Sequence, residues 1–193
     1  APDLIPLWLK VPAILGDLLV AWIFYRAIRR WHSERWGVIV AAVYLFVPVT
    51  WYDSALWGQV DTMGVLVGGL ALIWLIDRKP ELATAAAVAA VLVKPQFGIF
   101  VPVVGLVLLR WYVRRPGDLG WLRDPAGPIR LVTSAAAGFV TLVLMIVPFD
   151  LETRVTDGLA TIPVVADIRG LLALVQTTAG SYNFLTANAF NPW

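Results

Sequence analysis

Long apolar runs separated by short charged segments make up most of the chain. The runs that hold few charged side chains are 11–28, 36–52, 62–76, 82–93, 97–109 and 131–149. A helix needs about 20 apolar residues to cross the roughly 30 Å hydrocarbon core of a bilayer, so only the first and last runs approach that length. The shorter runs must recruit flanking residues or lie beside a water-filled cavity, where broken helices are tolerated. The pattern predicts an all-α, polytopic transmembrane helical bundle of about six spans or half-spans.

The segment 150–193 follows the last run and carries a different pattern. Its apolar side chains recur at the spacing of one helix face, namely Val164, Ile168, Leu171 or Leu172, and Val175. This spacing predicts a helix that lies in the outer membrane interface, or equally an ordinary amphipathic helix packed on the bundle. Because no internal repeat is visible, we expect residues 1–193 to form a single transmembrane domain with 150–193 as an external loop.

The composition agrees with residence in a membrane. Hydrophobic residues make up 60% of the chain and charged residues 15%, against roughly 45–50% and 25% in soluble domains, so a soluble domain is excluded. The chain has no cysteine and one histidine, which excludes thiolate metal sites and histidine clusters. No acidic residues have the spacing of a metal motif, and a divalent ion held by carboxylates stays an open alternative.

Basic residues gather on one side of the predicted bundle. One set of alternate loops holds eleven of the 15 Lys and Arg residues, namely Arg26, Arg29, Arg30, Arg35, Arg78, Lys79, Arg110, Arg114, Arg115, Arg123 and Arg130. The other set holds Lys10, Lys94, Arg154 and Arg169. The positive-inside rule assigns the first set to the cytoplasm, with loops at 29–35, 77–81 and 110–130, and leaves outside the segments 1–10, 53–61, 94–96 and 150–193. Both ends are then external, so we expect at least one further span upstream.

The basic loops are short and lack alternating aromatic residues, which excludes nucleic acid as an expected partner.

Two acidic residues lie in an aromatic segment between the second and third runs. Asp53, Trp57 and Asp61 follow one another at spacings of four, so a helical segment would place them on one face, with the amide of Gln59 nearby. Carboxylates accept protons from hydroxyl groups and indole rings stack on sugars, so we predict a saccharide site with Asp61 and Asp53 as candidate catalytic residues. The alternative is structural, with both aspartates capping helices and the aromatic rings forming an interfacial belt.

A second polar site interrupts the apolar pattern between the fourth and fifth runs. Pro95 follows Lys94 and is predicted to break the helix there. A cation on the outer side of a cavity suits a phosphate or diphosphate group. The alternatives are that Lys94 extends to the interface, or that it forms a structural ion pair with an acidic neighbour such as Asp61.

Two further polar groups complete the candidates. Asp17 lies inside the first run, where a structural role, such as a pair with Lys10 or another buried base, is favoured over a place in the cavity. Near the end of the chain, Tyr182, Asn188 and Asn191 offer polar groups to sugar hydroxyls, although amide side chains form turns as readily.

Three motifs in this order resemble a known superfamily. They are Trp57-Gly58-Gln59-Val60-Asp61, Lys94-Pro95-Gln96 with Pro102 following, and Asn188-Ala189-Phe190-Asn191-Pro192-Trp193. Together they resemble bacterial and archaeal members of the GT-C glycosyltransferases. The resemblance is strongest to relatives of the dolichyl-phosphate-glucose-dependent glucosyltransferases and the polyprenyl-phosphate-mannose-dependent mannosyltransferases.

The resemblance implies a hexosyltransferase of the bacterial or archaeal inner membrane. Such an enzyme moves mannose or glucose from a polyprenyl-phosphate donor to a glycan, lipid or protein acceptor on the extracytoplasmic face, and no cofactor is implied beyond this donor. The residues predicted to bind substrate are Trp57, Gln59, Lys94, Gln96, Tyr182, Asn188 and Asn191. Of these, the resemblance itself assigns Gln59, with Asp61, to the donor or acceptor cavity, and Asn188 and Asn191 to its outer rim. It also implies that Lys94 and Gln96 would face the donor phosphate. The family's general base is typically an Asp in a first external loop upstream of the matched region, so the resemblance implies that this chain alone is inactive.

Two other classes of protein share parts of the pattern. A transporter would use broken helices and a buried Lys and Asp as an ion or solute site at the membrane midplane. Against it, the polar residues are predicted at the outer face, and no pair of interrupted helices repeats. A non-catalytic membrane subunit would only pack against partners, and the Trp-Gly-Gln-Val-Asp segment argues against that role. The transferase is the preferred expectation.

Overall fold

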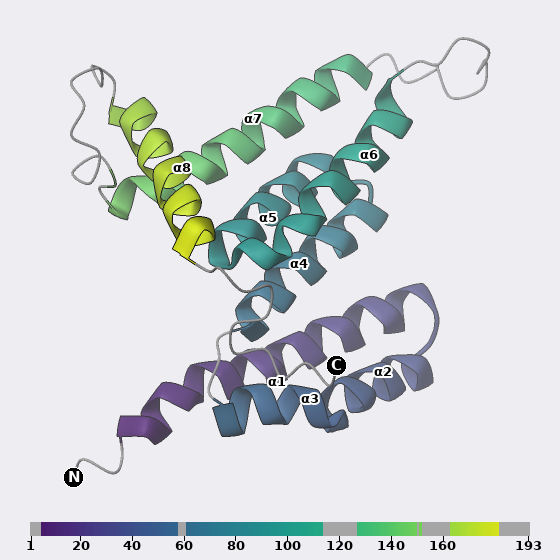
Figure 1. Ribbon diagram of the computed structural model, residues 1–193. Helices are drawn as coiled ribbons and strands as arrows, with labels where there is room; N and C mark the ends of the chain where they lie inside the picture. Colours follow the sequence, from purple (N-terminus) through teal and green to yellow (C-terminus); the bar gives the residue numbers. More distant parts are fainter. Residues whose placement is uncertain (1–4, 58–60, 114–126, 150, 152–162, 182–193) are drawn as a thin grey trace. The chain divides into compact units, whose positions relative to one another are not determined.

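The computed structural model describes residues 5–57, 61–113, 127–149, 151 and 163–181. Within these ranges every regular element is a helix, which confirms the all-α prediction (Figure 1). The α-helices are α1 (Ile5–Trp31), α2 (Glu34–Phe46), α3 (Pro48–Trp51), α4 (Asp61–Ile76), α5 (Pro80–Val93), α6 (Phe100–Tyr112), α7 (Gly127–Ile146) and α8 (Pro163–Ser181). Shorter helical segments of other types are the π-helix η2 (Tyr52–Trp57) and the 3-10 helices η3 (Pro95–Ile99) and η4 (Val147–Phe149).

The chain divides into two compact units, Ala1–Thr141 and Leu142–Trp193. The second contains α8, whose existence the apolar spacing predicted. In this unit the backbone N–H of Leu151 donates to Asp167 Oδ1 at 2.9 Å, and Leu151 lies against Gly170, where there is no room for a side chain. Whether α8 lies in a membrane interface stays a prediction. All other contacts below belong to the first unit.

Helices α1 and α2 form a hairpin (Figure 1). The Ser33 side chain caps α2 by accepting a hydrogen bond from the Trp36 backbone N–H at 3.4 Å. Gly37 is buried against the backbone of Tyr25, so the two helices approach closely at that point. The apolar run 36–52 is not one straight helix, because the chain bends by 47° at the Pro48 junction between α2 and the segment that follows it. Proline removes the backbone donor that would continue α2.

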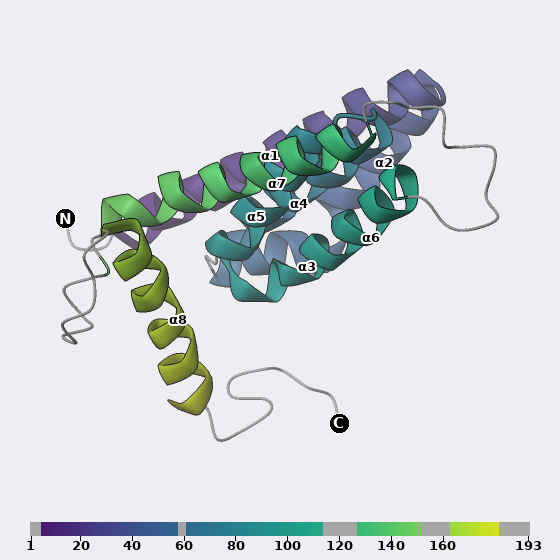
Figure 2. The same cartoon turned by 90° about the horizontal axis from the view of Figure 1, so that it is seen from above.

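Helices α4 and α5 form a second hairpin, and α6 packs beside α5 (Figures 1 and 2). The tight turn between α4 and α5 depends on Arg78, which has a positive φ of 58°. In this conformation the Lys79 N–H donates to Trp74 O at 2.9 Å and the Arg78 N–H to Leu75 O at 3.1 Å, so carbonyls at the end of α4 are satisfied. Pro80 then occupies the first turn of α5, where its missing N–H costs nothing.

Alanine is the most frequent residue in the buried interior of the first unit. The buried cluster consists of Ala71, Leu75, Ala83, Ala86, Ala87, Val104 and Leu108. Large apolar side chains instead lie on the outside, as at Phe46 and Val49, which are 79% and 74% exposed. Small residues at helix contacts and large apolar residues facing outward are expected of a protein whose surroundings are lipid.

Helix lengths support membrane residence. Three helices are long and apolar enough to span a bilayer, Lys10–Trp31, Pro95–Tyr112 and Ile129–Phe149, and the bent pair Glu34–Phe46 with Pro48–Ser54 would be a fourth if it forms one span. The fifth run, 97–109, reaches spanning length by recruiting flanking residues, as predicted for the shorter runs, because η3 continues into α6. Helices α4 and α5 are shorter. The chain is a helical membrane protein, and the number of six spans stays a prediction.

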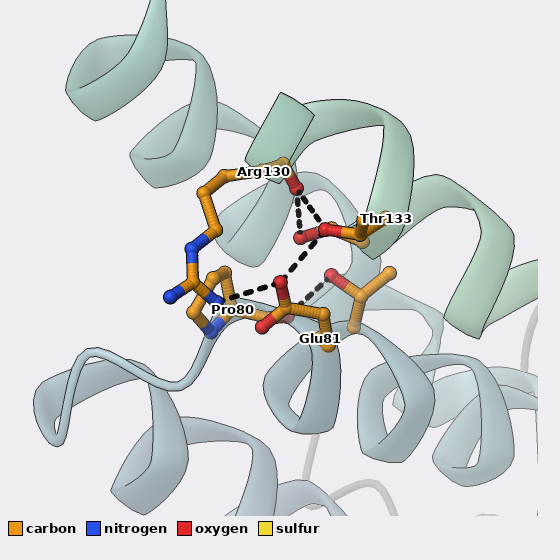
Figure 3. A network of polar contacts seen from close by, with 6 residues as sticks. Pro80, Glu81, Arg130 and Thr133 are labelled. Atoms are coloured by element: carbon orange, nitrogen blue, oxygen red, sulfur yellow. Dashed lines mark hydrogen bonds and ion pairs between the residues drawn. The ribbon is translucent and has the colours of Figure 1, made fainter. Parts of the chain in front are cut away.

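A polar network joins the start of α5 to α7 (Figure 3). Glu81 Oε1 accepts hydrogen bonds from Arg130 Nη1 at 2.9 Å and from Thr133 Oγ1 at 2.7 Å. Glu81 precedes the apolar run 82–93. Burial alone would raise the pKa of Glu81, but the hydrogen bonds from Thr133 and Arg130 outweigh burial and hold this pKa below its ordinary value. The ionised carboxylate therefore stabilises the contact between the two helices.

Candidate functional site

The helix break between α5 and η3 is the structural origin of the candidate site. Helix α5 ends at Val93, and Lys94 is extended with φ −156° and ψ 125° before Pro95 begins η3. Proline disfavours a helical conformation in the residue before it, which explains why the break falls at this residue. The predicted break is confirmed.

Lys94 and Gln96 both contact Asp61, the first residue of α4. Lys94 Nζ lies 2.5 Å from Asp61 Oδ1, and Gln96 Nε2 donates to Asp61 Oδ2 at 3.4 Å. The two charged side chains are only partly exposed. The contact that was one alternative for Lys94, an ion pair with Asp61, is confirmed. Asp61 begins its helix, where the partial positive charge of the N-terminus also favours a carboxylate.

Two glycines of α4 allow η3 and α6 to approach closely enough for this contact. The ring of Phe97 lies over Gly64 and the ring of Phe100 over Gly68, in each case occupying the place of a missing Cβ. The two rings are parallel, with centroids 6.3 Å apart. This aromatic pair holds the segment after Lys94 against α4. Sequence reasoning missed it, although the Gly-x-x-x-Gly spacing of Gly64 and Gly68 is a readable signal for close helix packing.

Asp17 belongs to a second polar cluster, which is built from hydroxyl groups. Its Oδ1 accepts hydrogen bonds from Tyr44 Oη and Thr62 Oγ1, both at 2.9 Å. Thr62 Oγ1 also lies 3.2 Å from Ser54 Oγ, and Asp17, Ser54 and Thr62 are buried. The expected pair between Asp17 and a basic residue is wrong for the part of the chain that the structure describes, where hydroxyl donors satisfy the carboxylate. The expectation that the bundle satisfies this acid internally is confirmed.

Asp53 interacts electrostatically with both the Lys94–Asp61 pair and the cluster around Asp17. The α-helical face that was predicted to join it to Trp57 is not formed. Asp53 lies in η2, a π-helix whose hydrogen bonds join residues five apart, so the α-helical spacing to Trp57 does not apply. Asp53 is within electrostatic reach of Asp61, Lys94 and Asp17. Because Asp61 and Thr62 are adjacent in α4, one turn of that helix carries a member of each cluster.

Several predicted residues lie outside what the structure describes. They are Gln59, Tyr182, Asn188 and Asn191, and the side chain of Trp57. Their assignment to substrate binding stays a prediction. The structure thus brings together Asp61, Lys94 and Gln96, with Asp53 nearby, and adds Tyr44, Ser54 and Thr62 around Asp17.

The chemistry of this arrangement is that of carboxylates beside one cation. Among the described side chains, no group of three or more His, Cys, Asp or Glu residues could hold a metal ion. Lys94 can bind an anion, and Asp61, Asp53 and Asp17 can accept protons or hydrogen bonds from hydroxyl groups.

Comparisons of the chain with protein-family models, with curated proteins and with solved structures found no match.

Proposed function

We propose that the chain forms the donor-holding part of a membrane glycosyltransferase that moves a hexose, mannose or glucose, from a polyprenyl-phosphate donor to an acceptor on the extracytoplasmic face. The observation that carries the proposal is the meeting of Lys94, Gln96 and Asp61 at a helix break in an apolar protein. An ammonium and an amide that share one carboxylate form a polar site that can receive a phosphate and a hydroxyl group together.

A donor phosphate that binds at this site would have to compete with Asp61 for Lys94. In the unliganded protein, Lys94 is neutralised by Asp61 at 2.5 Å. A donor phosphate competes for the ammonium, and the carboxylate of Asp61 is then free to accept a hydrogen bond from a hydroxyl group. The exchange keeps Lys94 paired before and after binding, and Asp61 keeps the amide of Gln96 and the N-terminus of α4 as partners after the ammonium has turned to the phosphate.

The transfer step follows from this exchange. A base removes the proton of an acceptor hydroxyl, the acceptor oxygen forms a bond to the anomeric carbon, and the bond from that carbon to the phosphate oxygen breaks. The polyprenyl phosphate leaves with the electron pair, and Lys94 stabilises the charge that develops on it. Asp61 or Asp53 accepts the proton or orients the hydroxyl, whereas a base on a first external loop is what the family resemblance implies.

Donor binding and sugar transfer test the proposal separately. Membranes that contain the protein are incubated with radiolabelled polyprenyl-phosphate mannose or glucose, and both retained donor and labelled product are measured. We expect Lys94→Ala to weaken donor retention and Asp61→Asn to reduce transfer, with Arg35→Gln, an exposed cation on α2, as the control for charge.

Two outcomes would contradict the proposal. If no lipid-phosphate sugar is retained by the unaltered protein, the site does not hold such a donor. If donor retention and transfer are unchanged in both Lys94→Ala and Asp61→Asn, these residues take no part in the reaction.

One observation favours a transporter as a second candidate. Asp17 lies near the middle of α1, is buried, and is surrounded by hydroxyl donors from α2 and α4. A buried carboxylate at the depth of a membrane midplane is a frequent proton or ion site in transporters. Proton or sodium uptake into vesicles that contain the protein, lost in Asp17→Asn and retained in Lys94→Ala, would favour this alternative.

A further inference from the structure

A basic pocket lies away from the candidate site, at the C-terminal end of α1. It has a volume of about 540 Å³ and is lined by Trp22, Arg26, Arg29 and Arg30 from α1 and by Ile73 from α4, among others. Its arginines belong to the basic set that the positive-inside rule assigns to the cytoplasmic side. The pocket therefore combines cationic and apolar walls at the end of a helix that is long enough to span a bilayer.

Two of its three arginines have no acidic partner in ion-pair distance among the described residues. Arg30 is paired with Asp77. Arg26 instead lies over the Trp22 ring at 5.6 Å, and Arg29 lies over the Tyr25 ring at 5.8 Å. Arg29 also donates to Tyr25 Oη at 3.1 Å. The aromatic rings hold the guanidinium groups of Arg26 and Arg29 in place, and their remaining N–H groups can donate hydrogen bonds to the oxygens of a phosphate group.

The face of α1 that carries Arg26 and Arg29 is apolar further along the helix. Leu15, Leu18 and Trp22 precede them at helical spacing and are 57%, 53% and 55% exposed. From Leu15 to Arg29 the helix rises about 21 Å, close to the depth of one lipid leaflet with its headgroup. One stripe of side chains thus changes from apolar to cationic over the length of a lipid molecule.

We propose that the pocket formed by Trp22, Arg26 and Arg29 binds the headgroup of an anionic diacyl phospholipid, with an acyl chain lying along Leu18 and Leu15. Basic pockets between membrane helices are suited to anionic headgroups, because the phosphate gains cationic partners while its chains stay in the apolar layer. The inference rests on membrane residence and not on the glycosyltransferase proposal, so either can fail without the other.

Lipid binding to the purified chain in nonionic detergent tests the inference. Phosphatidylglycerol or phosphatidylcholine is titrated, and bound lipid is counted by native mass spectrometry. We expect phosphatidylglycerol to bind more tightly, and each of the substitutions Arg26→Gln and Arg29→Gln to weaken it roughly fivefold. Arg35→Gln is the matched control, since it removes the same charge near the same end of the hairpin without lining the pocket.

We expect Arg26→Gln to fold normally, because Arg26 is exposed and, among the described residues, its contact is with the Trp22 ring. Arg26→Lys, which keeps the charge, should retain most of the binding and serves as the second variant. Equal binding of the two lipids would overturn the inference, as would an equal loss in Arg35→Gln. Displacement of the lipid by glycerol phosphate at the same concentration would also overturn it, because the pocket would then take a soluble anion.

Discussion

The ring of Phe97 occupies the space that a side chain at Gly64 would need. This contact brings the segment that follows Lys94 against α4, whose first residue is Asp61. The contact between Gly64 in α4 and Phe97 in η3 therefore supports the position from which Lys94 pairs with Asp61. The geometry of the candidate site depends on a residue that carries no functional group.

Gly64→Ala tests this dependence. The added methyl group would overlap the Phe97 ring, and such overpacking costs about 1–3 kcal/mol in the free energy of unfolding. Gly105→Ala is the matched control, because nothing lies within 4 Å of its Cβ position, and we expect that variant to be at least as stable as the unaltered protein. Unfolding by SDS in mixed micelles measures both. Equal stabilities for the two variants would contradict the close contact.

Thr62→Val tests the hydroxyl cluster around Asp17. Valine keeps the shape of threonine but removes a donor to a buried carboxylate, so we expect the free energy of unfolding to fall by about 1–3 kcal/mol. Thr141→Val removes a hydroxyl that bonds to the carbonyl of Ala137 in its own helix, and we expect a change under about 0.5 kcal/mol. The same SDS titration compares them. If Thr62→Val lowered the free energy of unfolding no more than Thr141→Val does, Asp17 would not depend on the Thr62 hydroxyl.

Arg78→Gly and Arg78→Ala separate the two roles of the residue in the turn between α4 and α5. Both substitutions remove the guanidinium group, which lies 3.9 Å from the Trp111 ring. Only glycine adopts the positive φ without steric cost, so we expect the alanine variant to be less stable than the glycine variant by about 1 kcal/mol. The reverse order would mean that the turn does not have a left-handed residue at this position.

Acidification should weaken the contact between α5 and α7. The folded-state pKa of Glu81 is held below its ordinary value of 4.5, so its stabilising contribution is fully present above that value and is lost as the pH falls through the lower folded-state pKa. Hydrogen exchange of the first turn of α5, followed between pH 7 and 3 and corrected for the intrinsic rate, measures the loss. We expect Glu81→Gln to lack this pH dependence. An unchanged acid response in Glu81→Gln would assign the effect to another carboxylate.

Much of the helical architecture could be predicted from the sequence, because local features determine it. Apolar runs located the helices, and Pro95 marked the break after Lys94 because a proline acts on its immediate neighbour. The pair between Lys94 and Asp61 was one of two structural alternatives for that lysine. A charge in an apolar protein needs a partner, and few acids were near enough in the predicted topology.

The partners of Asp17 could not be predicted in the same way. Tyr44 and Thr62 lie 27 and 45 positions further along the chain, and their contact with Asp17 depends on how α2 and α4 rotate against α1. Hydroxyl side chains are common on helices and carry no signal for such a rotation. The π-helix over Tyr52–Trp57 was missed for a related reason, since a single extra residue per turn leaves no mark in the apolar pattern.

The alanine-rich interior has a consequence for the thermodynamics of this protein. Helices α4 and α5 meet through Ala71, Ala83, Ala86 and Ala87, which remove little apolar area from their surroundings, while the large apolar side chains face outward in the folded state already. Unfolding within a micelle would therefore expose little new apolar surface to water. Since that exposure is the source of a large heat-capacity change, we expect a small one here and a stability that varies almost linearly with temperature.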